Sequence, residues 1–278
     1  MKKISRRSFM AAAAVSVAAL ALTACGGSAS SAASSVASSA ASSEAVSSSA
    51  AADLTTVEAG KLTMATNAAF PPYEMTTDAG EFEGIDVDTA KAIAEKLGLE
   101  LQIDDMDFDA ALLSVQQGKA DIVMAGVTVT DERKAVMDFS DSYATGIQSI
   151  IVPEGSDIAS PDDLAGKKIG TQRGTTGYIY CSDDFGDSNV VAYDNGLTAV
   201  QALNNGQVDA VVIDNAPAQE FVAANPGLKV LDTSYAEEDY AIGMAKGSAL
   251  EDAVNKALEE LKADGTLQAI VDKYINAN

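Results

Sequence analysis

Apolar residues recur along the chain in two patterns, one typical of amphipathic helices and one typical of short buried strands. Apolar positions spaced i, i+3, i+4, i+7 predict helices over residues 90–97 and 108–115, and a glycine suited to end a helix follows each of them closely. Apolar positions at helical spacing predict two more helices near the C-terminus, over residues 250–261 and 267–274. Each helix has one apolar face, as expected for helices that pack on a sheet.

Five short apolar runs bounded by polar or turn residues are predicted to be strands. They cover residues 62–65, 122–125, 168–170, 190–192 and 210–213. Strands that alternate with amphipathic helices are the pattern of α/β architecture with parallel sheets.

An internal similarity indicates two related lobes rather than one long sheet. The sequence QGKADIVM at residues 117–124 is matched by NGQVDAVV at residues 205–212. Both segments combine a helix end, a glycine, an aspartate and a buried strand. A single doubly wound domain is the alternative interpretation.

The N-terminus has the pattern of an export signal. Four basic residues within the first seven precede an apolar run over residues 9–22, which is too short to span a membrane. The sequence LTACG at residues 22–26 resembles the bacterial lipobox, in which the cysteine is acylated and becomes the first residue after cleavage. We therefore expect a signal peptide over residues 1–24 and lipid on Cys25. An ordinary cleavage site followed by a free cysteine is the alternative.

Residues 25–57 are expected to form the lipidated cysteine and a flexible tether. From Gly26 to about Ala52 the chain is almost entirely Ser and Ala, so it has too little apolar surface to fold. The protein is therefore expected outside the cytoplasm as a monomer, anchored to the cell membrane as a lipoprotein.

Composition excludes several classes of function. With no His and only two Cys, the chain has no His-based catalytic unit, no His-ligated metal and no thiolate zinc site. A formal net charge of −23 opposes binding to nucleic acid and to anionic lipid surfaces, so membrane attachment would need a covalent anchor. The acidic run at residues 105–109 lacks the glycine and the closing glutamate of a calcium loop. We predict no metal and no cofactor.

Residues that follow the predicted strands supply the groups needed to bind a zwitterion, and parallel sheets bind ligands beyond the carboxyl ends of their strands. An arginine offers a bidentate partner for a carboxylate, two threonines offer donors, an aspartate offers a partner for an ammonium, and two phenylalanines offer aromatic walls. In that order these residues are Arg133, Thr128 and Thr176, Asp214, and Phe70 and Phe108.

These segments resemble family 3 extracellular solute-binding proteins, the amino-acid receptors of ABC importers. The resemblance covers roughly residues 58–278 and includes GIDVD at residues 84–88, although Thr89 stands where an aliphatic residue is usual. It implies a two-lobed, type II periplasmic-binding-protein-like α/β fold, in which each lobe is a mostly parallel sheet flanked by helices and two hinge crossings join the lobes. The implied division is lobe 1 over residues 58–146 and 241–278, and lobe 2 over residues 147–240.

The resemblance also assigns roles to the candidate residues. Arg133, Thr128 and the Gly126 amide would hold the α-carboxylate of an amino acid from lobe 1. From lobe 2, Thr176 would add donors and Asp214 would hold the α-ammonium. The protein would then capture a free α-amino acid and deliver it to the permease of an ABC transporter.

The ligand's side chain would lie between Phe70 and Phe108, near Tyr73. Asn67 stands where receptors of cationic or amide ligands often carry aspartate, which argues against Lys or Arg as the ligand and favours a polar or uncharged amino acid. Polar, aromatic and sulfur-containing amino acids are therefore the expected ligands.

Each candidate also has a simpler structural interpretation. Arg133 could pair with Asp131 or Asp138 on the surface, Asp214 could cap the following helix, and Phe108 has the spacing of a core residue.

Two other functions compete with transport. One is an enzyme on the same scaffold, such as a dehydratase or a cell-wall lyase, for which Glu74 is the only carboxylate in the predicted cleft without a head-group role. The other is a receptor that senses the ligand, which usually adds signalling domains. We predict that the protein is not an enzyme.

Overall fold

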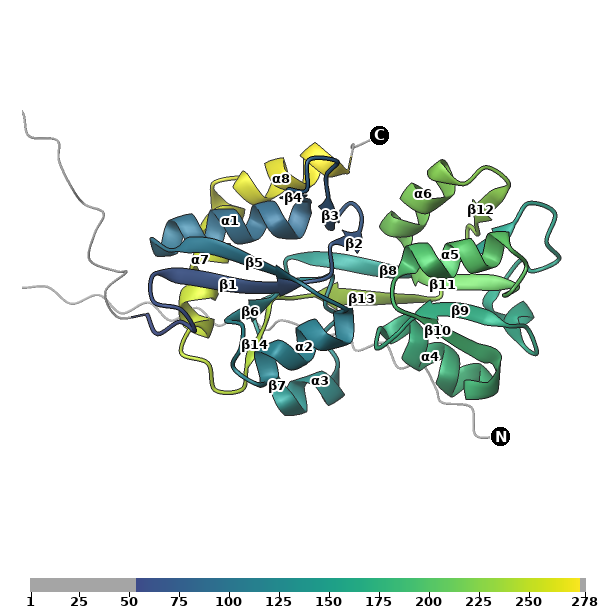
Figure 1. The fold of residues 1–278 in the computed structure, drawn as a ribbon, viewed down its shortest axis with the longest axis horizontal. Coiled ribbons are helices and arrows are strands. Elements are labelled where there is room, and N and C mark those ends of the chain that lie inside the picture. The colour runs from purple at the N-terminus through teal and green to yellow at the C-terminus, as the bar shows by residue number, and fades with distance from the viewer. Residues whose placement is uncertain (1–53, 276–278) are drawn as a thin grey trace, which may run out of the picture. The chain divides into compact units, whose positions relative to one another are not determined.

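The computed structural model describes residues 54–275 of the 278-residue chain (Figure 1). The predicted signal peptide, Cys25 and the predicted tether as far as residue 53 lie outside the described residues. Between residues 54 and 275, no helix is both long enough and apolar enough to cross a membrane.

Five strands form a mixed sheet, which we call the first sheet. They are β1 (Lys61–Thr66), β5 (Glu100–Asp105), β6 (Ile122–Val123), β7 (Met137–Phe139) and β14 (Gly243–Ala245). The strand order is β5-β1-β6-β14-β7. β1 runs parallel to β5 and β6, whereas β14 runs antiparallel to β6 and β7.

Five helices accompany the first sheet. They are α1 (Ile85–Leu97), α2 (Phe108–Gln116), α3 (Asp131–Val136), α7 (Glu251–Ala263) and α8 (Thr266–Tyr274). Figure 1 shows α1 and α8 on one face of the sheet and α2 and α3 on the other. The first sheet is therefore covered on both sides, which explains why β1 is buried along nearly its whole length.

Six strands form the second sheet. They are β8 (Ala144–Pro153), β9 (Ile169–Gln172), β10 (Val190–Tyr193), β11 (Ala210–Asp214), β12 (Leu228–Val230) and β13 (Ala236–Tyr240). The order is β10-β9-β11-β8-β12, and β13 also pairs with β8. The accompanying helices are α4 (Thr176–Phe185), α5 (Gly196–Asn204) and α6 (Asn215–Ala224), with the short 3-10 helices η1 (Pro161–Leu164) and η2 (Asp187–Asn189).

A small antiparallel sheet follows β1. Its strands are β2 (Ala69–Phe70), β3 (Glu74–Thr76) and β4 (Phe82–Glu83). Phe70 pairs with Glu74 across β2 and β3, so this hairpin fixes the positions of both residues.

The first sheet, the small sheet and their helices form the first lobe, and the second sheet with its helices forms the second lobe. The chain passes from the first sheet to the second at residues 140–143, between β7 and β8. It returns at residues 241 and 242, between β13 and β14.

The predicted helices are confirmed, and their ends have the expected physical cause. α1 ends at Gly98, whose φ of 68° lies in the left-handed region that glycine adopts freely. The next amide, Leu99 N, donates to Ala94 O at 2.9 Å and satisfies a carbonyl of the last turn. α2 buries Phe108, Ala111 and Val115 on one face, as the predicted spacing requires.

The two-lobed α/β fold is confirmed, but the sheets are mixed rather than mostly parallel. The predicted strands correspond to β1, β6, β9, β10 and β11, which are the strands that form the parallel pairs together with β5. The antiparallel pairs involve β7, β8, β12, β13 and β14, for which no strands were predicted, and two of these strands pair with β6 and β11. Two predicted ends differ by two residues, because β6 ends at Val123 and β9 extends to Gln172.

Candidate functional site

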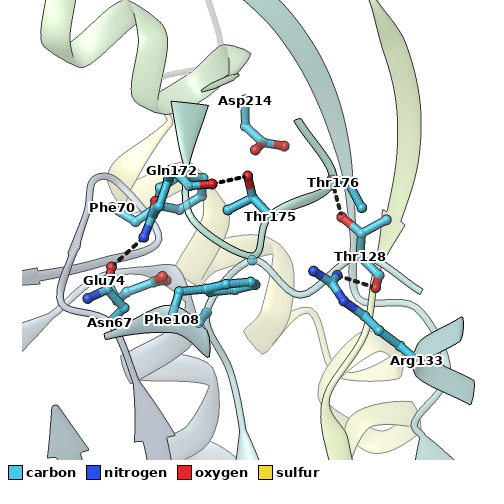
Figure 2. Close-up of a pocket in the computed structure, with 12 residues that line it drawn as sticks. Asn67, Phe70, Glu74, Phe108, Thr128, Arg133, Gln172, Thr175, Thr176 and Asp214 are labelled. Atoms are coloured by element: carbon cyan, nitrogen blue, oxygen red, sulfur yellow. Dashed lines mark hydrogen bonds between the residues drawn. The ribbon is translucent and has the colours of Figure 1, made fainter. Parts of the chain in front are cut away.

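A cavity lies between the two lobes, where β1, β6, β9 and β11 end (Figure 2). Parallel strands place their carboxyl ends, and the residues that follow them, at one edge of a sheet, which is the usual ligand position in such folds. The lining residues are Asn67, Phe70, Glu74, Phe108, Ala125, Gly126, Thr128, Arg133, Gln172, Thr175, Thr176 and Asp214. All the predicted ligand-binding residues except Tyr73 are among them.

Arg133 is held by the first turn of α3. Thr130 caps this helix, because its Oγ1 accepts a hydrogen bond from Arg133 N at 3.1 Å. The Arg133 side chain is only 8% exposed. Its Nη1 donates to Thr128 O at 2.7 Å, and its Nη2 donates to Gly174 O of the second lobe at 3.2 Å. A guanidinium has five N–H donors, so further donors can still reach a ligand carboxylate.

The surface ion pairs considered for Arg133 do not occur. Asp138 pairs instead with Lys246 at 2.5 Å, and no ion pair joins Arg133 to Asp131 within residues 54–275. The guanidinium carbon of Arg133 lies 5.4 Å from the centre of the Phe108 ring. Burial lowers the pKa of Arg133, but a guanidinium retains its charge in proteins. A buried arginine on an aromatic wall therefore forms the cationic end of the cavity.

Two threonines meet at the boundary between the lobes. Thr128 Oγ1 and Thr176 Oγ1 lie 3.4 Å apart, and Thr176 is the first residue of α4.

The Gly126 amide, predicted to bind a carboxylate, donates to Asp86 Oδ2 at 2.9 Å. Gly126 has a φ of 55°, and a Cβ there would lie 2.9 Å from the ring of Phe70. Glycine at this position therefore lets the aromatic wall approach the backbone.

Asp214 forms an anionic end of the cavity. Its Oδ2 accepts a hydrogen bond from Gln148 Nε2 at 2.9 Å, and its Oδ1 accepts one from the Tyr240 hydroxyl. Asp214 occupies the N-cap position of α6, but its side chain makes no capping hydrogen bond. Burial, supported by the nearby charge of Glu238, raises the pKa of Asp214 to about 7, although the two hydrogen bonds act in the opposite direction.

Glu238 and Gln148 extend this anionic end and are not among the predicted site residues. Glu238 Oε2 accepts hydrogen bonds from Thr128 Oγ1 at 3.0 Å and from Gln148 Nε2 at 2.9 Å. The Gln148 amide therefore bridges Glu238 and Asp214. The paired strands β8 and β13 bring these residues together, and the only local signal is the burial of Glu238 and Tyr240 on one face of β13.

Asn67 and Gln172 connect the lobes at the opposite side of the cavity. Gln172 Nε2 donates to Asn67 Oδ1 at 2.9 Å, and Asn67 Nδ2 donates to Met106 O at 2.9 Å. Gln172 and Thr175 are additional lining residues that were not predicted. Gln172 is the last residue of β9, and Thr175 caps α4 by accepting from Tyr178 N at 3.3 Å.

The aromatic residues have different positions. Phe70 and Phe108 line the cavity, and Phe108 also packs in the core against Ala111 and Val115 on α2. Tyr73 lies behind Phe70, with ring centres 6.0 Å apart, and lines a separate groove. It therefore supports the wall rather than facing the cavity.

Glu74 is a lining residue with an unusual environment. It is 0% exposed, and its side chain is hydrogen-bonded to that of the neighbouring acid Asp86. Burial, together with the neighbouring charge of Asp86, raises the pKa of Glu74 well above its usual value.

A cavity with a buried cation on one lobe and a buried acid on the other, between two lobes built on mixed sheets, defines a two-lobed binding protein of the type II periplasmic class. Residues 62–277 match the bacterial extracellular solute-binding proteins, family 3, and the chain belongs to this family. The family consists of solute-binding proteins rather than enzymes, so the enzymatic alternatives are not supported. Residues 54–275 contain no group of three acidic or Cys side chains placed to hold a metal.

Curated relatives and solved structures are similar over most of the chain. A probable histidine-binding protein of Neisseria gonorrhoeae is 35% identical over 95% of this chain and 94% of its own length. The L-cystine-binding protein TcyJ of Escherichia coli is 33% identical over 80% of this chain and 85% of its own length. The structure of an ancestral arginine-binding protein bound to arginine is 44% identical, with a TM-score of 0.74, over 78% of this chain and 99% of that one.

Proposed function

We propose that this chain is the substrate-binding lipoprotein of an amino-acid ABC transporter, which binds a free α-amino acid between its lobes and delivers it to the permease. The observation that carries the proposal is the placement of Arg133 and Asp214, which line one cavity from opposite lobes. A zwitterion needs both partners, because burial of either head group without one would be strongly unfavourable. The relatives support this substrate class, since their names specify histidine, cystine and arginine.

The two head-group partners also suggest how binding and closure are coupled. Arg133 and Thr128 belong to the first lobe, whereas Asp214 and Thr176 belong to the second. An amino acid satisfies both charges only when the lobes are together, so it should shift the population toward the closed form.

A thermal-shift screen of the purified soluble domain against the twenty amino acids, cystine and ornithine tests the binding function. A ligand at a hundredfold excess over its Kd should stabilise the folded protein by about 2.7 kcal/mol. Agmatine and putrescine, which lack an α-carboxylate, are matched negative controls. If no amino acid raises the unfolding temperature, the proposed function is wrong.

The lipid anchor is a separate part of the proposal and rests on the lipobox-like sequence ending at Cys25. We expect Cys25→Ser to move the protein from the membrane fraction to the soluble fraction, because a net charge of −23 gives the domain no electrostatic affinity for anionic lipid. Fractionation followed by immunoblotting measures this, with Cys181→Ser as the control. A Cys25→Ser protein that stays in the membrane fraction would exclude Cys25 as the anchor.

A further inference from the structure

Glu74 lies at the cavity beside a second buried acid, Asp86. Both side chains are 0% exposed, and they are hydrogen-bonded to each other. Two carboxylates repel each other and have no proton to donate, so a hydrogen bond between two carboxyl groups requires a proton on one of them. The pair therefore carries a proton, and the surroundings of each acid decide which of them holds it.

Asp86 has the surroundings of an anion. Its Oδ2 accepts a hydrogen bond from Gly126 N at 2.9 Å, and its Oδ1 accepts one from the Tyr143 hydroxyl at 2.7 Å. Asp86 is also the second residue of α1, where the helix dipole favours a negative charge. Burial raises the pKa of Asp86, but the hydrogen bonds from Gly126, Tyr143 and Glu74 act in the opposite direction.

Glu74 has the surroundings of a neutral acid. Neither of its oxygens accepts a hydrogen bond from the described residues, and it begins a strand rather than a helix. Burial raises the pKa of Glu74 well above its usual value, and the charge of Asp86 and the hydrogen bond to Asp86 act in the same direction. Glu74 is therefore the member of the pair that holds the proton and donates it to Asp86.

The titratable groups around Glu74 come from several elements of both lobes. They are Asp86 of α1, Asp105 of β5, Tyr73 of the loop between β2 and β3, Tyr143 of the crossing between β7 and β8, Asp214 of β11 and, across the cavity, Arg133. The charges of Asp105 and Asp214 raise the pKa of Glu74 further. Arg133 does not offset them, because it donates to backbone carbonyl groups instead.

A neutral Glu74 gives the cavity a balanced set of charges. Arg133, Asp214 and Glu74 are the lining residues with ionisable side chains of these two signs. When Glu74 is protonated, one cation and one anion remain, which is the complement of a zwitterionic head group. A second buried anion without a partner would be strongly unfavourable.

We propose that Glu74, in the amino-acid-binding protein proposed above, is a neutral acid that acts as a positioning residue. Its proton holds the Asp86 carboxylate in place. Asp86 in turn holds the Gly126 turn of the cavity wall and the Tyr143 hydroxyl at the crossing between the lobes. Loss of the proton would place two like charges in contact and loosen both attachments.

Carbon-13 NMR of protein labelled in its glutamate carboxyl groups detects this proton. At pH 7 the wild type should show a protonated carboxyl signal that is absent from Glu74→Gln. Glu81→Gln, at an exposed position of the same small sheet region, is the matched control and should retain the signal. A wild-type spectrum in which every glutamate is ionised overturns the proposal, and this result requires no variant to fold. A Glu74→Gln spectrum that retains every protonated signal also overturns it.

The dependence of stability on pH gives a second test. The unfolded state ionises Glu74 near its usual pKa, whereas the folded state keeps the proton, so the wild type loses stability as the pH rises through this range. The glutamine of Glu74→Gln cannot ionise and still donates to Asp86. The ratio of the unfolding equilibrium constants, wild type over Glu74→Gln, should therefore rise by up to about tenfold per pH unit between pH 5 and pH 7. Denaturant titration measures this ratio, which should stay nearly constant for Glu81→Gln. A constant ratio for Glu74→Gln would contradict the proposal.

Amide hydrogen exchange tests the positioning role. Glu74→Met removes the donor as well as the charge, so Gly126 N should exchange at least about tenfold faster than in Glu74→Gln. Leu231 N, which donates to Ile150 O at 2.9 Å in the second lobe, should exchange equally in both variants. Equal exchange of Gly126 N in the two variants would overturn the positioning role. These three measurements use no ligand, so the amino-acid-binding function stands or falls separately with the thermal-shift screen.

Discussion

Asp214 and Glu74 are two buried acids that line the same cavity, but they differ in their partners. Asp214 accepts hydrogen bonds from Gln148 and Tyr240, whereas Glu74 accepts none from the described residues. Asp214 is thus held ready for the ammonium that every α-amino acid carries, with its orientation fixed before binding. Glu74 lies beside Asp86, and burial together with the charge of Asp86 raises the pKa of Glu74 well above its usual value. The comparison teaches that hydrogen-bond donors hold Asp214 for a ligand ammonium, whereas burial beside a second acid favours the neutral form of Glu74.

The largest effect on affinity is expected from replacing Arg133, the cation that lines the cavity. Arg133→Ala should weaken the binding of every amino acid by about 4 kcal/mol, because the ligand carboxylate would lose a buried, charged partner. Arg133→Lys should also bind poorly, because an ammonium cannot reproduce the planar fork. Titration calorimetry measures both, with the half-exposed Arg173→Ala as the matched control. Near wild-type affinity in Arg133→Lys would remove the guanidinium from the carboxylate site.

Neutralising Asp214 should have a smaller effect that applies to all amino acids. Asp214→Asn keeps the shape of the side chain but removes the charge opposite the ammonium, so affinity should fall by about 2 kcal/mol for L-arginine and L-glutamine alike. Asp194→Asn, at an exposed position, is the control. Unchanged affinity in Asp214→Asn would remove Asp214 from the ammonium site.

The smallest expected effect is the dependence of affinity on pH. Because the pKa of Asp214 is raised to about 7, its ionised form becomes available only as the pH rises through that value. An ammonium needs the ionised form, so the Kd for L-glutamine should rise as the pH falls from 8 to 5, by less than the roughly thirtyfold that complete removal of the charge costs at about 2 kcal/mol. The groups that surround Asp214 are Gln148, Tyr240 and Glu238.

The variant Asp214→Asn distinguishes the source of this dependence. The asparagine side chain that it introduces cannot titrate, so the Kd of the variant should change much less between pH 8 and pH 5. A variant with the full wild-type slope would assign the titration to a group other than Asp214.

The parts of the fold that could be predicted are those with a local pattern. The internal similarity is confirmed in detail, because Gly118 and Gly206 have φ values of 67° and 68° and precede β6 and β11 in the two lobes. The matching aspartates of the two segments also make equivalent hydrogen bonds. Asp121 accepts from Thr63 N at 2.8 Å, and Asp209 accepts from Lys168 N at 2.7 Å, so each ties its strand to the neighbouring one.

The candidate site was predictable where residues follow parallel strands, as Arg133 and Asp214 do. It was not predictable where antiparallel strands bring distant segments together. Gln148 and Glu238 are 90 residues apart and meet only through the pairing of β8 with β13, for which no strands were predicted. The burial of Glu74 was also hidden, because burial is a property of the folded surroundings rather than of the residue type.

The most direct test of the account is a calorimetric comparison of L-arginine with two analogues that each lack one head group. Agmatine lacks the carboxylate assigned to Arg133, and 5-guanidinopentanoic acid lacks the ammonium assigned to Asp214. Both retain the guanidinium. The account predicts that the wild type binds each analogue at least about thirtyfold more weakly than L-arginine, because each leaves one buried charge unpaired. Binding of either analogue as tight as that of L-arginine would contradict the central claim that the cavity recognises an α-amino acid through Arg133 and Asp214.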